Sequence, residues 1–431
     1  MPEFRPFQGW RYNLAVVGDL DRVISPPYDV IDHATADRLL KASPYNVVRL
    51  ELPTAVNADP QAPYQRAASL LRRWCAENVL IKEAEPAYYL LRQHFSLGQE
   101  RLVRRGLFGI MRLVPFSQGV YPHENTMAGP KADRLALLEH LHANVSPVFA
   151  VYVDDSASLI EDIERTVCTQ PPLRAEDING VINELWPIYH QELIARIRAD
   201  VSHRAVLLAD GHHRYETALA YRDLVQQRSG QEWSPEHPAN FILICLVPSG
   251  DPGLRILPTH RLLNLDCPLG VRDLPTLLPP LFDVELIGSG LNAAEQCWHQ
   301  INSRGDSTSL GVGTADENSW AVVTPRDRDI LRRTTPSRSD VWHTLAVNLA
   351  HQVLLPRLVP QDSVRNIRYE HDVGAVARAL AHKQADLAIL VPPPSVKDFV
   401  TVSLAGERLP AKSTYFFPKL PTGLVLYRHD A

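Results

Sequence analysis

The chain has 431 residues, a formal net charge of -5 at pH 7, 45% hydrophobic residues and 22% charged residues. This length exceeds what one compact core usually serves and predicts two domains. The acidic balance argues against a general nucleic-acid binder, which needs a basic surface. The five cysteines form no CxxC pair, so neither a disulfide framework nor a zinc site is indicated. With no membrane-length apolar run and no signal-peptide pattern, we expect a cytoplasmic protein that binds no membrane.

Apolar runs and amphipathic segments alternate along the chain. The pattern predicts helices at residues 131–144, 191–200, 215–228 and 339–358, and strands at residues 87–95, 105–114, 147–153, 204–210, 240–247 and 386–391. The aromatic tail, residues 413–430, is β-like, and residues 268–335 carry weaker signals. We therefore expect an α+β fold with an N-terminal domain over residues 1–267. A C-terminal α/β domain is expected over residues 268–431, with a tail that returns to the site.

The stretch LLADGHHRYETALAYR places polar residues where a strand is predicted to become a helix. The first N–H groups of a helix lack internal partners and favour an anion. Gly211 permits close approach of a ligand, Arg214 can hold phosphate oxygens, and His212 and His213 can donate hydrogen bonds or transfer protons. Asp210 is expected to bind Mg²⁺ or to orient a histidine. The alternative is an ordinary helix capped by Asp210.

A second polar stretch, YPHENTMAGPKADR, precedes the predicted helix at residues 131–144. Glu124 is the candidate general base, and His123 beside it is a further catalytic candidate. Asn125 and Thr126 are candidate substrate ligands, and Asn125 is also a candidate metal ligand. The alternative is a surface loop that begins a helix. HENTM is not the HExxH zinc motif, because the second histidine is missing.

Lysine is rare, with seven among 44 basic residues. Lys131, Lys412 and Lys419 all lie in dense polar stretches, and a lysine retained where arginine is the rule suggests a need for a compact ammonium. Lys131 and Arg134 open a predicted helix, where the dipole disfavours cations, so a nearby anion is expected. Lys131, Arg134 and Lys412 are therefore candidates for neutralising a phosphoryl group.

Two further stretches contain candidate substrate ligands. ISPPYDVI places Tyr28 and Asp29 after a stiff Pro-Pro turn, and DPGLRILPTHRLL places His260 beside a predicted strand end. For each stretch a purely structural turn is the alternative.

The motifs ISPPYDVI, PHENT, KADRL, ADGHHRYETAL and KSTYFFPKLPTG follow one another in this order. Together they resemble a widespread bacterial and archaeal family that was long catalogued as a domain of unknown function and is described as SerK-like. The DGHHR turn is similar to the phosphate-binding turn of the ParB, sulfiredoxin and free-serine-kinase superfamily. The resemblance implies a ParB/sulfiredoxin-like mixed-sheet core with helices, and it makes residues 210–214 the phosphate cradle.

The same resemblance implies a small-molecule kinase that converts free L-serine to O-phosphoserine. It implies ATP, ADP or pyrophosphate as donor, Glu124 as base, and Mg²⁺ held by Asp210 and Asn125. Catalysis would then consist mainly of positioning and electrostatic stabilisation. Two alternatives stay open: a nucleotide-binding and nucleotide-hydrolysing regulatory switch of ParB type, and a phosphohydrolase acting on a phosphorylated amino acid.

Overall fold

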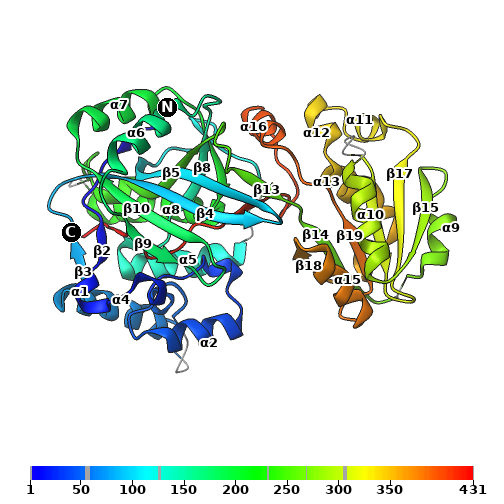
Figure 1. Cartoon of the computed structure of the whole chain (residues 1–431), viewed down its shortest axis with the longest axis horizontal. Coiled ribbons are helices and arrows are strands. Elements are labelled where there is room, and N and C mark those ends of the chain that lie inside the picture. Colours follow the sequence, from blue (N-terminus) through cyan, green and yellow to red (C-terminus); the bar gives the residue numbers. More distant parts are fainter. Residues whose placement is uncertain are drawn as a thin grey trace. The chain divides into compact units, whose positions relative to one another are not determined.

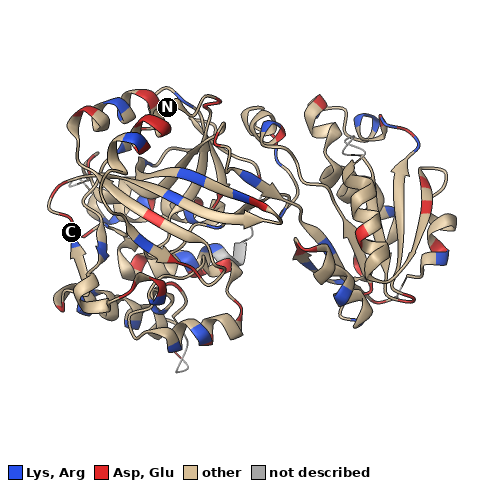
Figure 2. Ribbon diagram, viewed as in Figure 1, with Lys and Arg blue, Asp and Glu red and all other residues tan. Residues whose placement is uncertain are grey.

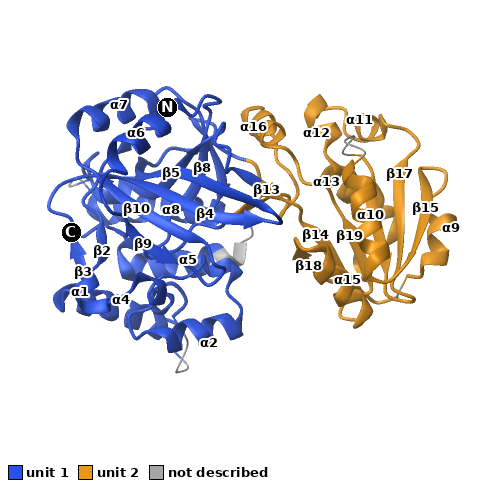
Figure 3. Ribbon diagram, in the orientation of Figure 1, with its two compact units in different colours: residues 1–122, 126–255, 418–431 blue, residues 123–125, 256–417 orange. Residues whose placement is uncertain are grey.

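The computed structural model describes residues 2–53, 59–124, 128–230, 233–267, 269–303 and 308–430. The predicted ligands Asn125 and Thr126 lie outside these residues. Residue contacts divide the chain into two compact units, shown in Figure 3. Unit 1 comprises residues 1–122, 126–255 and 418–431, and unit 2 comprises residues 123–125 and 256–417.

This division differs from the predicted boundary after residue 267. Strand β14 (His260–Leu265) pairs with β18 (Val364–Glu370) and with β19 (Leu387–Leu390), so it belongs to the sheet of unit 2. Residues 418–431, which we call the tail segment, belong to unit 1.

Unit 1 is built on a mixed sheet with the strand order β6-β11-β8-β12-β5-β4-β10-β9, and β1 pairs with β5. Figure 1 labels β4, β5, β8, β9 and β10 of this sheet. The β11–β6 and β12–β8 pairs are parallel, whereas the other pairs of this sheet are antiparallel. The strands are β1 (Phe4–Arg5), β4 (Tyr88–Leu97), β5 (Glu100–Arg112), β6 (Val120–Pro122), β8 (Val148–Tyr152), β9 (Leu173–Glu176), β10 (Ile182–Ile188), β11 (Val206–Asp210) and β12 (Phe241–Pro248).

Helices pack against this sheet through apolar side chains, and Tyr215 and Tyr221 of α8 are buried in the same core cluster as Leu208 of β11. Burial of this apolar surface is the main stabilising contribution. The helices of unit 1 are α1 (Leu14–Val17), α2 (His33–Ala42), α3 (Val48–Glu51), α4 (Ala62–Ala76), α5 (Ala128–Leu141), α6 (Ser158–Val167), α7 (Gln191–Val201) and α8 (His212–Ser229). Two short strand pairs, β2 (Trp10–Tyr12) with β3 (Leu80–Lys82) and β7 (Ala143–Asn144) with β21 (Tyr427–Arg428), complete the unit.

Unit 2 is an antiparallel sheet with the order β15-β17-β16-β19-β14-β18. Two separate hydrophobic clusters lie against it, one formed with α12 to α14 and one formed with α10 and α15. Its other helices and strands include α9 (Leu274–Leu277), β15 (Phe282–Ser289), α10 (Leu291–Ser303), β16 (Leu310–Thr314), β17 (Ser319–Pro325), α11 (Ile330–Thr334), α12 (Asp340–Thr344), α13 (Ala346–Leu349), α14 (Leu355–Leu358), α15 (Val373–Ala381), α16 (Val396–Leu404) and β20 (Tyr415–Phe417). Strand β20 pairs with β13 (Arg255–Leu257).

The predicted α+β fold, a mixed-sheet core with helices followed by a C-terminal portion of strands and helices, is confirmed. The prediction of one continuous helix at residues 339–358 is wrong in detail. Leu345 is extended and interrupts the helix, and residues 350–354 form a π-helical turn before α14. Pro356 lies in the first turn of α14. Proline lacks an N–H and its ring clashes with the carbonyl four residues earlier, so a widened turn before it is expected.

Basic and acidic residues are interspersed over both units (Figure 2). Among the described residues, no helix is both long enough and apolar enough to cross a membrane.

Candidate functional site

The residues Asp210 to Arg214, which we call the Asp210 turn, connect β11 to α8 in unit 1. Gly211 has φ 89° and ψ 26° and is the residue before the first helical turn. The left-handed conformation favours glycine, and a Cβ at this position would also lie 3.0 Å from the Arg214 guanidinium. The N-cap residue is thus Gly211 and not Asp210, which ends β11. The turn thus presents the N-terminus of an 18-residue helix.

Asp210 is held between two cations. Its Oδ1 lies 2.8 Å from Lys419 Nζ and its Oδ2 lies 2.6 Å from Arg214 Nη2. All three side chains are mostly buried, with 16%, 13% and 11% exposed for Asp210, Lys419 and Arg214. Burial disfavours the charged form of Arg214, but Asp210 and the other nearby negative groups outweigh it and raise the pKa of Arg214. Coulombic interactions are strong in such a buried place.

Arg214 also stabilises the turn through a hydrogen bond to the backbone. Its Nη1 donates to the carbonyl oxygen of Pro147, and its Nε has no hydrogen-bond partner among the described residues. Arg214 is therefore as much a structural part of the turn as a potential phosphate ligand.

Several residues predicted from separate motifs lie near the Asp210 turn. Tyr28 and Asp29 are among the groups that act electrostatically on Arg214, and Arg134 lies over the Tyr28 ring, 4.3 Å from its centroid. Burial raises the pKa of Tyr28 to about 12, so its hydroxyl is a donor at neutral pH. Unit 1 therefore brings together residues from three of the sequence motifs.

The cations that open α5 have acidic partners within the protein. Lys131 pairs with Glu216 of α8. Arg134 is almost fully buried, donates to the Glu51 carbonyl oxygen at 2.9 Å and also pairs with Asp133. The anion expected near this helix start is thus supplied at least partly by carboxylates of the chain itself.

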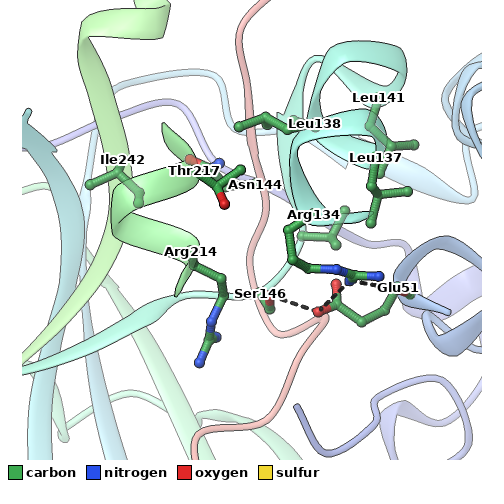
Figure 4. A pocket seen from close by; sticks show the side chains of 12 residues that line it. Glu51, Arg134, Leu137, Leu138, Leu141, Asn144, Ser146, Arg214, Thr217 and Ile242 are labelled. Carbon is green, nitrogen blue, oxygen red and sulfur yellow. Dashed lines mark hydrogen bonds and ion pairs between the residues drawn. The ribbon is translucent and has the colours of Figure 1, made fainter. Parts of the chain in front are cut away.

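A cavity of about 50 Å³ lies behind the Asp210 turn (Figure 4). Figure 4 shows Arg134, Glu51 and Ser146 on one side and Thr217 and Arg214 on α8. The Ser146 hydroxyl donates to Glu51 at 3.0 Å, whereas Thr217 Oγ1, in a residue only 3% exposed, has no partner among the described residues. The volume suffices for one or more water molecules.

The candidate base Glu124 belongs to unit 2, where its carboxylate accepts several hydrogen bonds. Oε1 accepts from the N–H groups of Ser413 and Thr414 at 3.0 and 3.2 Å and from the Thr414 hydroxyl at 3.2 Å. Oε2 accepts from the Lys412 N–H at 3.3 Å. Lys412 has φ 57°, an uncommon conformation for a residue with a side chain. Glu124 therefore orders the loop at residues 412–414, whatever else it does.

The two histidines predicted for unit 2 are both fully buried. His123 Nε2 lies 2.6 Å from Thr414 Oγ1 and so belongs to the Glu124 cluster. His260 packs edge-on against Trp298, and its Nδ1 accepts from the Val391 N–H at 3.2 Å. Burial lowers the pKa of His260 to about 3, so the imidazole is neutral. In this structure the predicted substrate ligand His260 is a core residue without solvent access, because it begins strand β14 and its ring packs against Trp298.

The predicted Mg²⁺ site at Asp210 can be compared with the side chains that contact this carboxylate. Each carboxylate oxygen of Asp210 already contacts a cationic side chain, and a metal ion there would be repelled by both cations unless a pair opened. Among the described residues, no group of three or more histidine, cysteine, aspartate or glutamate side chains is arranged to hold a metal. The residues present therefore suit an anion better than they suit a cation.

Sequence reasoning did not assign three residues that the structure places at this site. In the sequence, Lys419 stands out only as one of the few lysines, and this rarity is the one feature that points to it. Glu51 and Arg104 stand in no recognisable motif, and only the tertiary structure brings them there.

Fold and turn together define a mixed α/β protein with a candidate anion site at a strand-to-helix turn. The family model described as a protein of unknown function, DUF1015, matches residues 4–348, and the chain belongs to this family. The predicted family resemblance is thereby confirmed. No curated protein matches the chain.

Similar solved structures include a conserved hypothetical protein from Pyrococcus furiosus, with 11% identity, 75% of this chain and 96% of that chain covered, and a TM-score of 0.36. A free serine kinase variant in complex with AMP is 10% identical, with 74% and 92% coverage and a TM-score of 0.36. SbnI from Staphylococcus aureus, with a C-terminal truncation, is 11% identical, with 74% and 87% coverage and a TM-score of 0.32.

Proposed function

We propose that this protein is a small-molecule phosphotransferase that binds its phosphoryl donor at the Asp210 turn, with free L-serine as the acceptor that the family resemblance implies. The observation that carries the proposal is the left-handed Gly211 at the start of α8, with Lys419 and Arg214 beside it. The N–H groups of a first helical turn, a helix dipole and adjacent cations all favour the binding of a phosphate group.

The chain's own residues would act mainly by binding and orientation. The amides of the Asp210 turn would hold donor oxygens, with Lys419 and Arg214 offsetting their charge. Glu124 remains the predicted base for the acceptor hydroxyl, which a carboxylate can deprotonate when it lies within hydrogen-bond distance. If the donor carries Mg²⁺, the ion would supply further charge neutralisation, and no described residue of the chain is assigned to hold it.

A donor screen tests this function. Purified protein is incubated with serine, Mg²⁺ and each of ATP, ADP, CTP or pyrophosphate, and phosphoserine is quantified. Phosphoserine formation with one donor is the expected result. Donor hydrolysis without phosphoserine would support the regulatory switch instead, and phosphate release from phosphoserine alone would support the phosphohydrolase.

The Gly211→Ala variant tests the location of the donor. The left-handed conformation costs alanine about 1–2 kcal/mol. The added Cβ would also lie 3.0 Å from the Arg214 guanidinium. We expect the affinity for inorganic pyrophosphate, measured by calorimetry, to fall at least about tenfold, a loss of about 1.4 kcal/mol of binding free energy.

Gly180→Ala is the matched control, because Gly180 has φ 76°, is exposed and has no atom within 4 Å of the added Cβ. It carries the same backbone strain away from the site and should leave pyrophosphate binding unchanged. Equal affinities of the two variants would place the donor elsewhere.

A further inference from the structure

We propose that Lys419 is a phosphate-binding residue supplied by the tail segment, and that Asp210 is a positioning residue that orients Lys419 and Arg214. This inference rests on the proposed function, because it names the cation that contacts the donor. Lys419 lies 209 positions after Asp210 in the sequence, and no motif of the phosphate turn includes it.

The tail segment brings Lys419 to the turn along an anchored path. The Pro418 carbonyl oxygen accepts from Arg104 Nη2, and the Lys419 carbonyl oxygen accepts from Gln93 Nε2 at 3.3 Å. Further along, Thr422 exchanges two backbone hydrogen bonds with Ser25, at 2.8 and 3.2 Å. These anchors involve the backbone of the tail segment and not the Lys419 side chain, so they hold the tail segment in addition to the ion pair between Lys419 and Asp210.

The Lys419 ammonium is suited to this role. Its Nζ is held by Asp210 at 2.8 Å, and its side chain is 13% exposed. An ammonium carries three donors, so one contact with Asp210 is compatible with a second contact to a phosphate oxygen. Holding the long side chain in place beforehand reduces the entropy lost when the donor binds.

Two cationic side chains contact Asp210, and a third, Arg104, interacts with it electrostatically. Arg104 is 1% exposed and donates to the neutral groups of Gln93 and Pro418. Its Nη1 has no hydrogen-bond partner within the described part of the chain, and Asp210 is among the charges that act on it. Asp29 and Glu51 also act on Arg214, and Asp251 also acts on Arg104, so carboxylates of the chain balance much of this positive charge.

Asp210 then has a role that differs from metal binding. Its two oxygens each hold one cation, Lys419 at Oδ1 and Arg214 at Oδ2. A positioning carboxylate of this kind acts whether or not a metal accompanies the donor. A metal ligand, in contrast, contributes only when the metal is present.

The first test compares Lys419→Met, Lys419→Arg and the control Lys82→Met by calorimetric titration with inorganic pyrophosphate. Lys82 is an exposed lysine of the same unit. Loss of one charge-assisted contact is expected to weaken binding about 10- to 100-fold in Lys419→Met. Lys419→Arg should restore most of the affinity, and Lys82→Met should match the parent protein.

A purely structural role for Lys419 would show a different result. Lys419→Met would then lower the Tm and speed hydrogen exchange in the tail segment while pyrophosphate affinity stayed within about twofold of the parent. That outcome overturns the inference but leaves the donor site intact. If the parent protein itself binds no pyrophosphate or nucleotide, the proposed function fails instead.

The second test uses Asp210→Asn, titrated with pyrophosphate once in EDTA and once in excess Mg²⁺. For a positioning residue, the affinity ratio between variant and parent is the same in both buffers within about twofold. A loss confined to the Mg²⁺ buffer would make Asp210 a metal ligand and overturn its assignment as a positioning residue.

Discussion

Replacing Glu124 with glutamine should destabilise unit 2 in addition to any effect on turnover. The carboxylate accepts from three consecutive backbone N–H groups and one hydroxyl. Glutamine retains one acceptor oxygen, but its amide NH2 would face either the Lys412 N–H or the amides of Ser413 and Thr414, which are also donors. The other hydrogen bonds lose the assistance of the negative charge.

The magnitude follows from these contacts. Hydrogen bonds to a charged group contribute about 1.5–3 kcal/mol, neutral ones contribute about 0.5–1.5 kcal/mol, and an unsatisfied buried donor costs about 1–3 kcal/mol. Glu124→Gln is therefore expected to cost about 2–3 kcal/mol. In a unit of this size the Tm of unit 2 should fall by about 4–10 °C.

Scanning calorimetry of the full chain measures this shift, because the two units can unfold in separate transitions. Glu295→Gln, an exposed change on α10 of the same unit, is the control and should alter stability by less than about 0.5 kcal/mol. An unchanged Tm for Glu124→Gln would refute the view that the carboxylate orders the loop. Lost turnover in that case would point directly to a role as base.

Two further predictions concern His260 and Thr217. Burial, together with the charges of Arg261 and His371, lowers the pKa of His260 to about 3, whereas in the unfolded chain this pKa is about 6.5. The neutral imidazole therefore contributes fully to the stability of the folded state above pH 6.5, and this contribution is lost as the pH falls from 6.5 towards 3. At pH 5 the free energy of unfolding is about 2 kcal/mol lower for this reason. His260→Asn should therefore reduce the fall in the Tm of unit 2 between pH 7 and pH 5, and an equal fall in variant and parent would contradict the prediction. Thr217→Val replaces a buried hydroxyl that has no partner among the described residues. Denaturant unfolding should therefore show a free energy of unfolding that is up to about 1 kcal/mol higher than that of the parent. A lower value would mean that a bound water satisfies the hydroxyl.

The sequence by itself determined the local elements. The apolar run before Asp210, the glycine after it and the helical spacing that follows predict a strand, a turn and a helix, and β11 and α8 lie there. These features are local, because backbone conformation at Gly211 and helix formation depend on neighbouring residues. The weaker pattern of residues 268–335 gave no such prediction, although the structure contains β15, α10, β16 and β17 there.

Only the tertiary structure decided which residues meet. Lys419 reaches Asp210 because the tail segment is anchored by Arg104 and Gln93 on the central sheet of unit 1, and nothing near residue 419 encodes that path. Likewise, Glu124 finds its donors at residues 412–414, almost 300 positions later in the chain. Local spacing fixes which backbone groups can form a turn, but the partner of a buried charge is fixed by packing and by the cost of leaving that charge unpaired.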